Sequence, residues 1–274
     1  MKRDSQQFQG TEAELAALTR EVDEAHRATL PTMYAAAAEL GVQARQNEQS
    51  TRDKLPDVGL DRRRFLRGLG VVGLSAFALA ACSDDDGGSS SKSSPSGQAA
   101  PAPSGGTYTG DLLVVALAAA LENQAVGAYQ AAISAAGAGK LGTVPPAVAN
   151  FATTAMAQHA DHAKVWNNVL TQAGKPPITG VPLKSQTAVT DALGKVTDVP
   201  GVAKLALQLE DQAAQTYLFA EFNVTTPAGI ETAATIAPVE AMHAAILRYL
   251  LGEYPVPDDF LPVDKAAKPD DLTV

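Results

Sequence analysis

Cysteine and aromatic residues are scarce in this chain of 274 residues. The single cysteine, Cys82, excludes a scaffold held together by disulfide bonds. Tryptophan occurs once and aromatic residues make up 5% of the chain, so they do not indicate whether it forms one domain or two. The chain is instead rich in alanine, which favours helices.

A surplus of positive charge is also lacking. The formal net charge is −9, and residues 1–81 hold 11 basic and 11 acidic residues, so the whole of this charge lies after residue 81. A negative surface repels nucleic acid and suits cations or neutral partners. We therefore expect no nucleic-acid partner.

The apolar run from Gly68 to Ala81 is shorter than the roughly 20 residues that a transmembrane helix needs. It has the length and the basic flank of a signal sequence. Within residues 61–82, the motif that resembles a twin-arginine export signal consists of Arg62, Arg63, Phe65 and Leu66. The run ends in Leu-Ala-Ala-Cys, which resembles a lipobox whose Cys82 becomes lipidated. These motifs predict passage through the twin-arginine export machinery and a lipid anchor at the outer face of the cytoplasmic membrane or cell envelope.

We interpret residues 1–60 as an N-terminal extension that precedes the export signal. Strong helix formers fill residues 11–50, and we expect Pro31 to divide them into two helices. Alone they bury too little to form a core. The extension is interpreted as a cytoplasmic n-region of the signal, and a small partner-binding segment is the alternative.

The rest of the chain divides by composition. Residues 83–110 are rich in Ser, Gly and Pro and predict a flexible linker. Residues 111–255 predict an all-α domain of four long helices, with a long crossover between the second and the third. Their expected ranges are 111–136, 145–173, 198–223 and 226–251, with a short helix at 187–193. Residues 256–274 are expected to be a tail lying loosely on the surface.

A diverged internal repeat runs through the predicted domain. Leu121-Glu122-Asn123-Gln124-Ala125 returns as Leu209-Glu210-Asp211-Gln212-Ala213, with a tyrosine seven residues after each glutamate, at Tyr129 and Tyr217. In the other helix of each pair, His159 and His162 correspond to Glu240 and His243. The offset is 88 residues for the first helices and 81 for the second. Each half therefore contributes a glutamate helix followed by a histidine helix.

These repeated polar residues fall on the apolar stripes of their helices: Glu122, His159, His162, Glu210, Glu240 and His243. A buried carboxylate loses its water at a cost of several kcal/mol unless a cation compensates. Two first-row metal ions would do so, since they accept both carboxylate and imidazole ligands. A single zinc ion held by the three histidines is an alternative, and so is partial exposure of each glutamate. The two tyrosines are expected to hydrogen-bond the ligands, with a role in electron transfer as the alternative.

The repeated glutamates and histidines on four predicted helices are the motif by which the chain from Asp111 to about Pro255 resembles the ferritin-like superfamily of four-helix di-metal carboxylate proteins. In that family two helices supply one Glu each and the other two supply Glu-x-x-His. The resemblance assigns Glu122 and Glu210 to the single glutamates, and Glu240 with His243 to one Glu-x-x-His. His162 matches the second histidine, but His159 stands where the family has Glu. One bridging carboxylate is therefore missing from the expected set.

The resemblance implies a centre of two metal ions, with iron expected and manganese or zinc as alternatives, and ferroxidase or other oxygen-linked redox activity. Whether the chain is an enzyme stays open at this point. The alternative is a ferritin-like scaffold whose centre has degenerated and which serves as a structural or binding lipoprotein of the envelope. A homo-oligomer is compatible with either function.

Overall fold

A computed structural model describes residues 11–54, 107–257 and 261–274, without the side chains of 51–54. Within these ranges every regular element is a helix, which confirms the all-α prediction for the described part of the chain. The predicted export and lipidation residues Arg62, Arg63, Phe65, Leu66 and Cys82 lie outside the described residues, as does most of the predicted linker.

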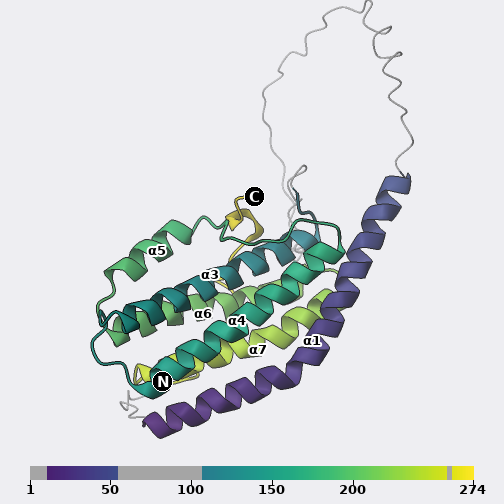
Figure 1. Cartoon of the computed structure of the whole chain (residues 1–274). Helices are drawn as coiled ribbons and strands as arrows, with labels where there is room; N and C mark the ends of the chain where they lie inside the picture. The colour runs from purple at the N-terminus through teal and green to yellow at the C-terminus, as the bar shows by residue number, and fades with distance from the viewer. Residues whose placement is uncertain (1–10, 55–106, 258–260) are drawn as a thin grey trace, which may run out of the picture. The chain divides into compact units, whose positions relative to one another are not determined.

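Four long helices lie side by side (Figure 1). They are α3 (Asp111–Gly137), α4 (Pro146–Gln172), α6 (Val199–Asn223) and α7 (Pro227–Leu250). Helix α3 packs along α4, α6 packs along α7, and α3 also contacts α6. Each helix begins and ends within about two residues of its expected range. Prolines in the first turn mark the starts of α4, α6 and α7, and glycines beyond the last turn mark the ends of α3, α4 and α7.

The helix ends show how the sequence fixes local structure. Asp198 caps α6 as expected, since its carboxylate accepts the backbone N–H of Gly201 at 2.8 Å. Thr226 occupies the expected N-cap position of α7, but its hydroxyl donates to Asp111 instead. The Asp111 carboxylate also accepts the backbone N–H groups of Thr225 and Thr226. The start of α3 is thereby tied to the turn between α6 and α7.

The long crossover between α4 and α6 contains a short helix, α5 (Gln186–Lys195), close to its expected position. The C-terminal tail returns to this crossover, where Leu272 forms an isolated antiparallel bridge with Leu183. Ala266 and Ala267 are buried, and the backbone N–H of Ala267 donates to Thr216 on α6. The expectation of a loosely lying tail was therefore wrong for this stretch, whose hydrogen bonds to α6 a sequence pattern does not reveal.

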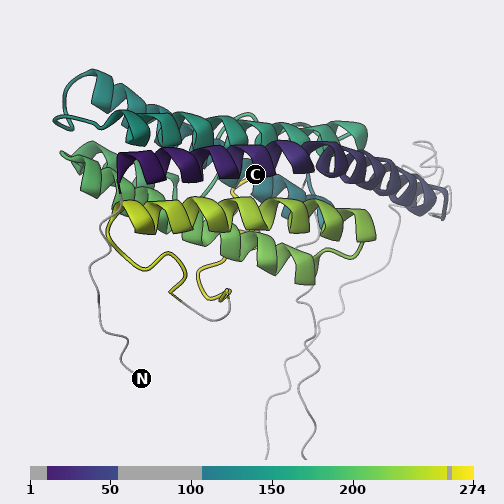
Figure 2. The same ribbon diagram turned by 90° about the horizontal axis from the view of Figure 1, so that it is seen from below.

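Helix α1 (Glu12–Lys54) is continuous through Pro31, so the predicted division into two helices was wrong. Pro31 is exposed, and buried residues before and after it, such as Val22 and Met33, hold the helix in place despite the lost hydrogen bond. The buried stripe of α1 follows spacings of three, four and seven residues: Leu15, Thr19, Val22, His26, Met33, Ala37 and Leu40. It lies along α4 and α7 (Figure 2).

Two hydrophobic clusters form the interior. One contains Leu117, Trp166 and Ile236, and the other contains Phe151 and Leu247. On α3, α4 and α6, the residues of the two clusters lie on opposite sides of the predicted ligand residues along the chain, and α7 follows the same order except at Val239. Helix α3 is long and apolar enough to cross a membrane, but 72% of its most apolar window is buried, as expected of a helix in a protein core. Hydrophobic side chains therefore flank the predicted ligand residues on both sides along the helices.

The docking of α1 onto α4 can be tested at Gly41. A Cβ atom added there would lie 2.7 Å from Cβ of Gln172, so Gly41→Ala forces α1 away from α4. We expect a loss of roughly 1–3 kcal/mol of unfolding free energy, as for other overpacked contacts. Thermal and denaturant melting of the full chain measure this loss.

The matched control is Gly127→Ala in α3, where an added Cβ meets nothing within 4 Å. Because alanine is the better helix former, this variant should gain about 0.5–1 kcal/mol. Equal gains in both variants would show that α1 does not dock as described.

Candidate metal centre

The structure brings all six predicted ligand residues together in the middle of the long helices. Helix α3 supplies Glu122, α4 supplies His159 and His162, α6 supplies Glu210, and α7 supplies Glu240 and His243. All six side chains are 0–2% exposed. Ligands at positions i and i+3 of one helix share a face, which explains why α4 and α7 each direct two of them inward.

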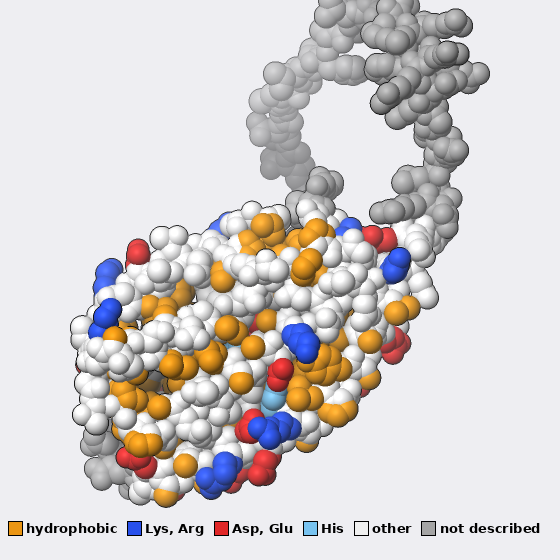
Figure 3. All heavy atoms as spheres, viewed as in Figure 1, with side chains coloured by type: hydrophobic (Ala, Val, Ile, Leu, Met, Phe, Trp, Pro, Cys, Tyr) orange, Lys and Arg blue, Asp and Glu red, His pale blue; other side chains and the backbone are white. Residues whose placement is uncertain are grey.

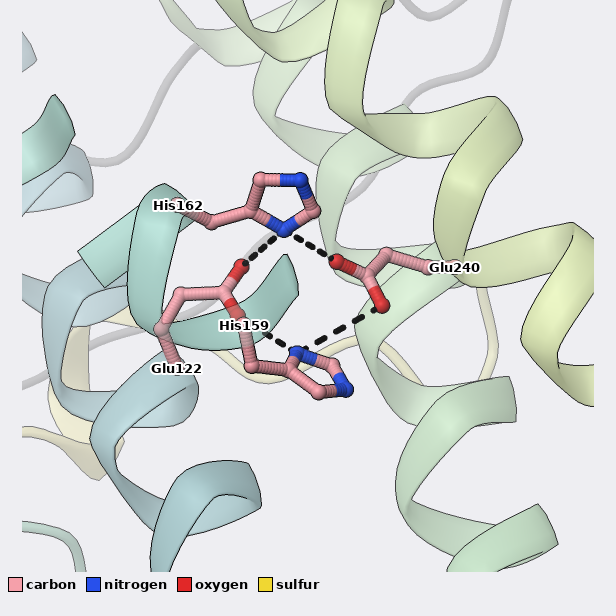
Figure 4. Close-up of side chains that lie close together, drawn as sticks. All are labelled: Glu122, His159, His162 and Glu240. Atoms are coloured by element: carbon pink, nitrogen blue, oxygen red, sulfur yellow. Dashed lines mark hydrogen bonds and ion pairs between the residues drawn. The ribbon is translucent and has the colours of Figure 1, made fainter. Parts of the chain in front are cut away.

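These side chains form two overlapping groups of metal-ligand type. The first group is Glu122, His159, His162 and Glu240, drawn in Figure 4, and the second is His159, Glu210, Glu240 and His243. Within each group the candidate ligand atoms lie within 4.8 Å of one another. Glu240 and His159 belong to both groups, so they occupy the positions between two candidate ion sites.

His159 lies among all three carboxylates. Its Nδ1 is 2.7 Å from Oε2 of Glu122 and 3.6 Å from Oε2 of Glu240, and its Nε2 is 3.1 Å from Oε1 of Glu210. A neutral imidazole has only one nitrogen free to bind a metal, whereas a carboxylate can use both oxygens. This histidine can therefore serve one ion at a time, where the glutamate of the family pattern would bridge two.

The other two histidines each turn one nitrogen toward the carboxylates. Nδ1 of His162 lies 2.8 Å from Oε1 of Glu240 and 3.6 Å from Oε1 of Glu122. Nδ1 of His243 lies 3.3 Å from Glu240 and 3.4 Å from Glu210. Each therefore presents Nδ1 as its candidate metal-binding atom.

Two tyrosines hold the outer glutamates in a reciprocal arrangement. Tyr129 on α3 donates its hydroxyl hydrogen bond to Glu210 on α6, and Tyr217 on α6 donates to Glu122 on α3. Each tyrosine thus serves the glutamate of the other repeat. The indole N–H of Trp166 donates to the Tyr217 hydroxyl at 2.8 Å, which fixes that ring further. The structure places both tyrosines directly behind the ligand residues, as expected for hydrogen-bonding supports.

Helix α1 contributes contacts that the sequence analysis missed. Asp23 on α1 lies 3.4 Å from the side-chain nitrogen of Gln158 on α4. The side-chain oxygen of Gln158 in turn accepts a 2.6 Å hydrogen bond from Nε2 of His243. His26, 2% exposed, packs its ring edge on His162 at a centroid distance of 5.0 Å and lies 3.4 Å from Asp161. The place of His26 on the buried stripe of α1 was the signal available in the sequence.

Unsatisfied polar atoms test whether the cluster suits metal ions. Several buried atoms make no hydrogen bond of acceptable geometry, although some lie within ion-pair distance of one another: both carboxylate oxygens of Glu240, Oε2 of Glu210, Nδ1 of His243, both ring nitrogens of His162 and Nδ1 of His26. Buried polar atoms normally have partners, and unpaired ones call for an explanation such as an ion. Most of these atoms belong to the two groups defined above. Carboxylate oxygens and imidazole nitrogens together suit iron, manganese and zinc.

Without a metal, the carboxylates and the histidines of the cluster shift one another's pKa values. Burial raises the pKa of Glu122, but the charge of His162 and hydrogen bonds from the histidines lower it overall to about 2. For His162, burial lowers the pKa, yet Glu122 and Glu240 raise it to about 9. At the other two histidines burial also lowers the pKa and the neighbouring glutamates outweigh it. The pKa of His159 is therefore raised well above its usual value, and that of His243 is raised. A metal ion must therefore displace protons to bind.

Comparison with protein families assigns the part of the chain that holds this cluster to a known domain family. A family model described as a ferritin-like domain matches residues 103–253, which is more than half of the chain. This range includes all six ligand candidates and the four long helices. No curated protein sequence and no solved structure shows a significant match to the chain.

The pKa shifts predict how the metal-free protein responds to pH. A raised histidine pKa adds stability that is complete below the usual value of 6.5 and is lost as the pH rises through the folded value, about 9 for His162. The lowered pKa of Glu122 adds stability that is complete above 4.5 and is lost as the pH falls toward about 2. After chelation, the melting temperature should be highest between pH 4.5 and 6.5 and fall steadily from pH 6.5 to 9.

The control is the same melting series on metal-loaded protein. Because protons compete with metal ions for the ligands, the difference in melting temperature between metal-loaded and chelated protein should grow from pH 6.5 to 9. A melting temperature of the chelated protein that stays constant from pH 6.5 to 9 would show that the histidines are not protonated in the folded state.

Proposed function

Because the chain belongs to the ferritin-like domain family, we propose that its four long helices form a ferritin-like bundle whose buried cluster binds two metal ions, with iron as the expected metal. The observation that carries the proposal is the pair of overlapping ligand groups that share Glu240, with buried oxygens and nitrogens lacking partners in both groups. Burying three carboxylates in one site calls for compensating positive charge.

The residues divide between the two candidate ion positions. Glu122 and His162 belong to the first position only, and Glu210 and His243 to the second only. Glu240 belongs to both and supplies the shared carboxylate. His159 serves one position at a time, so the two positions differ in their ligands. When bound, iron ions supply the capacity to take up or give electrons, which suits ferroxidase or other oxygen-linked redox activity with Fe(II) as the substrate.

The chain's own residues orient the ligands and exclude water. The hydroxyls of Tyr129 and Tyr217 fix the outer glutamates. Gln158 accepts the Nε2–H of His243, so that Nδ1 is the nitrogen left for a metal. The two hydrophobic clusters shield the site along the helix axes. Such fixed outer contacts typically change metal affinity 10- to 100-fold.

We place this activity in an exported protein. The arginine pair at Arg62 and Arg63, with Phe65 and Leu66, supports export by the twin-arginine machinery, and Cys82 supports a lipid anchor at the outer face of the membrane. Cleavage before Cys82 would separate α1 from the rest of the chain. Since α1 contacts Gln158 and His162, it would support the ligand histidines only before cleavage, when metal is loaded in the cytoplasm.

A second candidate function is a scaffold without metal, and one observation favours it. His159 already lies 2.7 Å from Glu122 and 3.1 Å from Glu210, so these carboxylates have a cationic partner in the absence of metal. The chain would then act as a structural or binding lipoprotein of the envelope. A zinc site made of all three histidines has less support, because neither ligand group in the described residues contains all three.

Elemental analysis separates these candidates. The full chain, purified from iron-supplemented cells, is expected to hold close to two metal ions. Glu240→Gln should lose both, because its carboxylate is shared, whereas Glu122→Gln should retain about one. Iron per chain is measured by inductively coupled plasma mass spectrometry.

Glu221→Gln is the matched control, since Glu221 lies on α6 outside the ligand cluster, and it should retain two ions. A metal-free parent with full helicity and a normal melting transition would reject the di-metal proposal and support the scaffold.

A further inference from the structure

A second feature of the interior is an apolar cavity of about 390 Å³. It lies where α3 and α7 end and where α4 and α6 begin. Figure 3 shows hydrophobic side chains over much of the drawn face, including its left end. The volume of the cavity falls in the range of small-molecule sites, about 300–1,000 Å³.

The cavity exists because small side chains line it. Four of its alanines, Ala132, Ala152, Ala203 and Ala206, stand on three facing helices where larger residues would fill the space. Protein interiors are normally packed without voids of this size, since unfilled space forfeits dispersion contacts. The alanines on these facing helices therefore leave room for an occupant.

The polar groups of the wall are already engaged. Among the described residues that line the cavity none is charged, and Tyr129 and Thr153 alone have polar side chains. The Tyr129 hydroxyl donates to Glu210, and the Thr153 hydroxyl donates to the carbonyl of Ala149. Water needs two to four polar partners to occupy a buried site, so this cavity suits water poorly. Charged ligands are excluded for the same reason.

One end of the cavity is near the candidate metal centre. Tyr129 and Phe151 are buried wall residues, whereas Gly137, Ala149 and Thr153 are exposed and mark the mouth. The Tyr129 ring stacks on His159 at a centroid distance of 5.7 Å, and the Phe151 ring meets His243 edge-on at 6.0 Å. A molecule in the cavity would thus be separated from the ligand histidines by one aromatic ring.

We propose that this cavity binds one uncharged, hydrocarbon-rich small molecule, made of aromatic rings or of an alkyl chain. Apolar cavities of about 150 Å³ hold a single benzene ring, so there is room for two linked rings or a medium-length chain. The occupant enters through the exposed rim and lies against Tyr129 and Phe151. Binding needs no metal ion, because no candidate ligand residue lines the cavity.

The test uses N-phenyl-1-naphthylamine, an uncharged two-part aromatic probe that fluoresces in apolar surroundings. Titration of the full chain should show saturable binding with one high-affinity site per chain. Ala152→Phe fills the cavity from α4 and should weaken this binding at least tenfold. Ala206→Phe fills it from α6 and should do the same, which protects the result against misfolding of one variant.

Ala157→Phe is the matched control, because it adds the same ring to the exposed face of α4 and should bind within twofold of the parent. All variants keep residues 68–81, so any probe bound by that apolar run is common to them. Displacement of the probe by 1-decanol is expected.

Equal probe binding by the parent and by two folded cavity-filling variants would overturn the proposal. So would a change of oligomeric state in those variants without a change in probe binding, since a second copy of the chain would then cover the cavity. Chelated protein should bind the probe as the parent does, within threefold. A failure of metal binding in the separate elemental analysis would therefore leave this result intact.

Discussion

Three carboxylates buried together in a helical interior are the constraint on which the rest of this structure depends. Glu122, Glu210 and Glu240 are each 2% exposed or less, and unpaired charges at such a position would cost several kcal/mol apiece. Three histidines lie among them, and the neighbouring carboxylates raise the pKa of His159 and of His162, which favours their protonated forms when no metal is bound. Protons on these histidines offset part of the carboxylate charge, and they must leave when cations bind.

The internal repeat explains how one short motif builds this cluster. Each half supplies a glutamate, and each tyrosine crosses over to hold the glutamate of the other half. The symmetry fails at His159, which corresponds to Glu240, and at Gln158, which corresponds to Val239 and supports His243. The two candidate ion positions are therefore unequal in ligands and in outer support. Helix α1 adds to this inequality, because His26 packs on His162 alone among the ligands.

Local patterns predicted much of this structure. Prolines, glycines and apolar periodicity located the long helices, and the offsets of 88 and 81 residues selected all six residues of the cluster. Features that depend on tertiary packing were missed. Pro31 does not break α1, because contacts on both sides hold the helix, and the tail is fixed by bonds to α6. The apolar cavity also has no sequence signature, since alanines on facing helices leave space only once those helices are assembled.

The central claim is that Glu240 lies between two ion positions. The most direct measurement is a crystal structure of the iron-loaded chain with anomalous diffraction recorded at the iron absorption edge. We expect two anomalous peaks, one within the group of Glu122 and His162 and one within the group of Glu210 and His243, each in contact with Glu240. A single peak, or none with His159 still bonded to Glu122 and Glu210, would contradict the account.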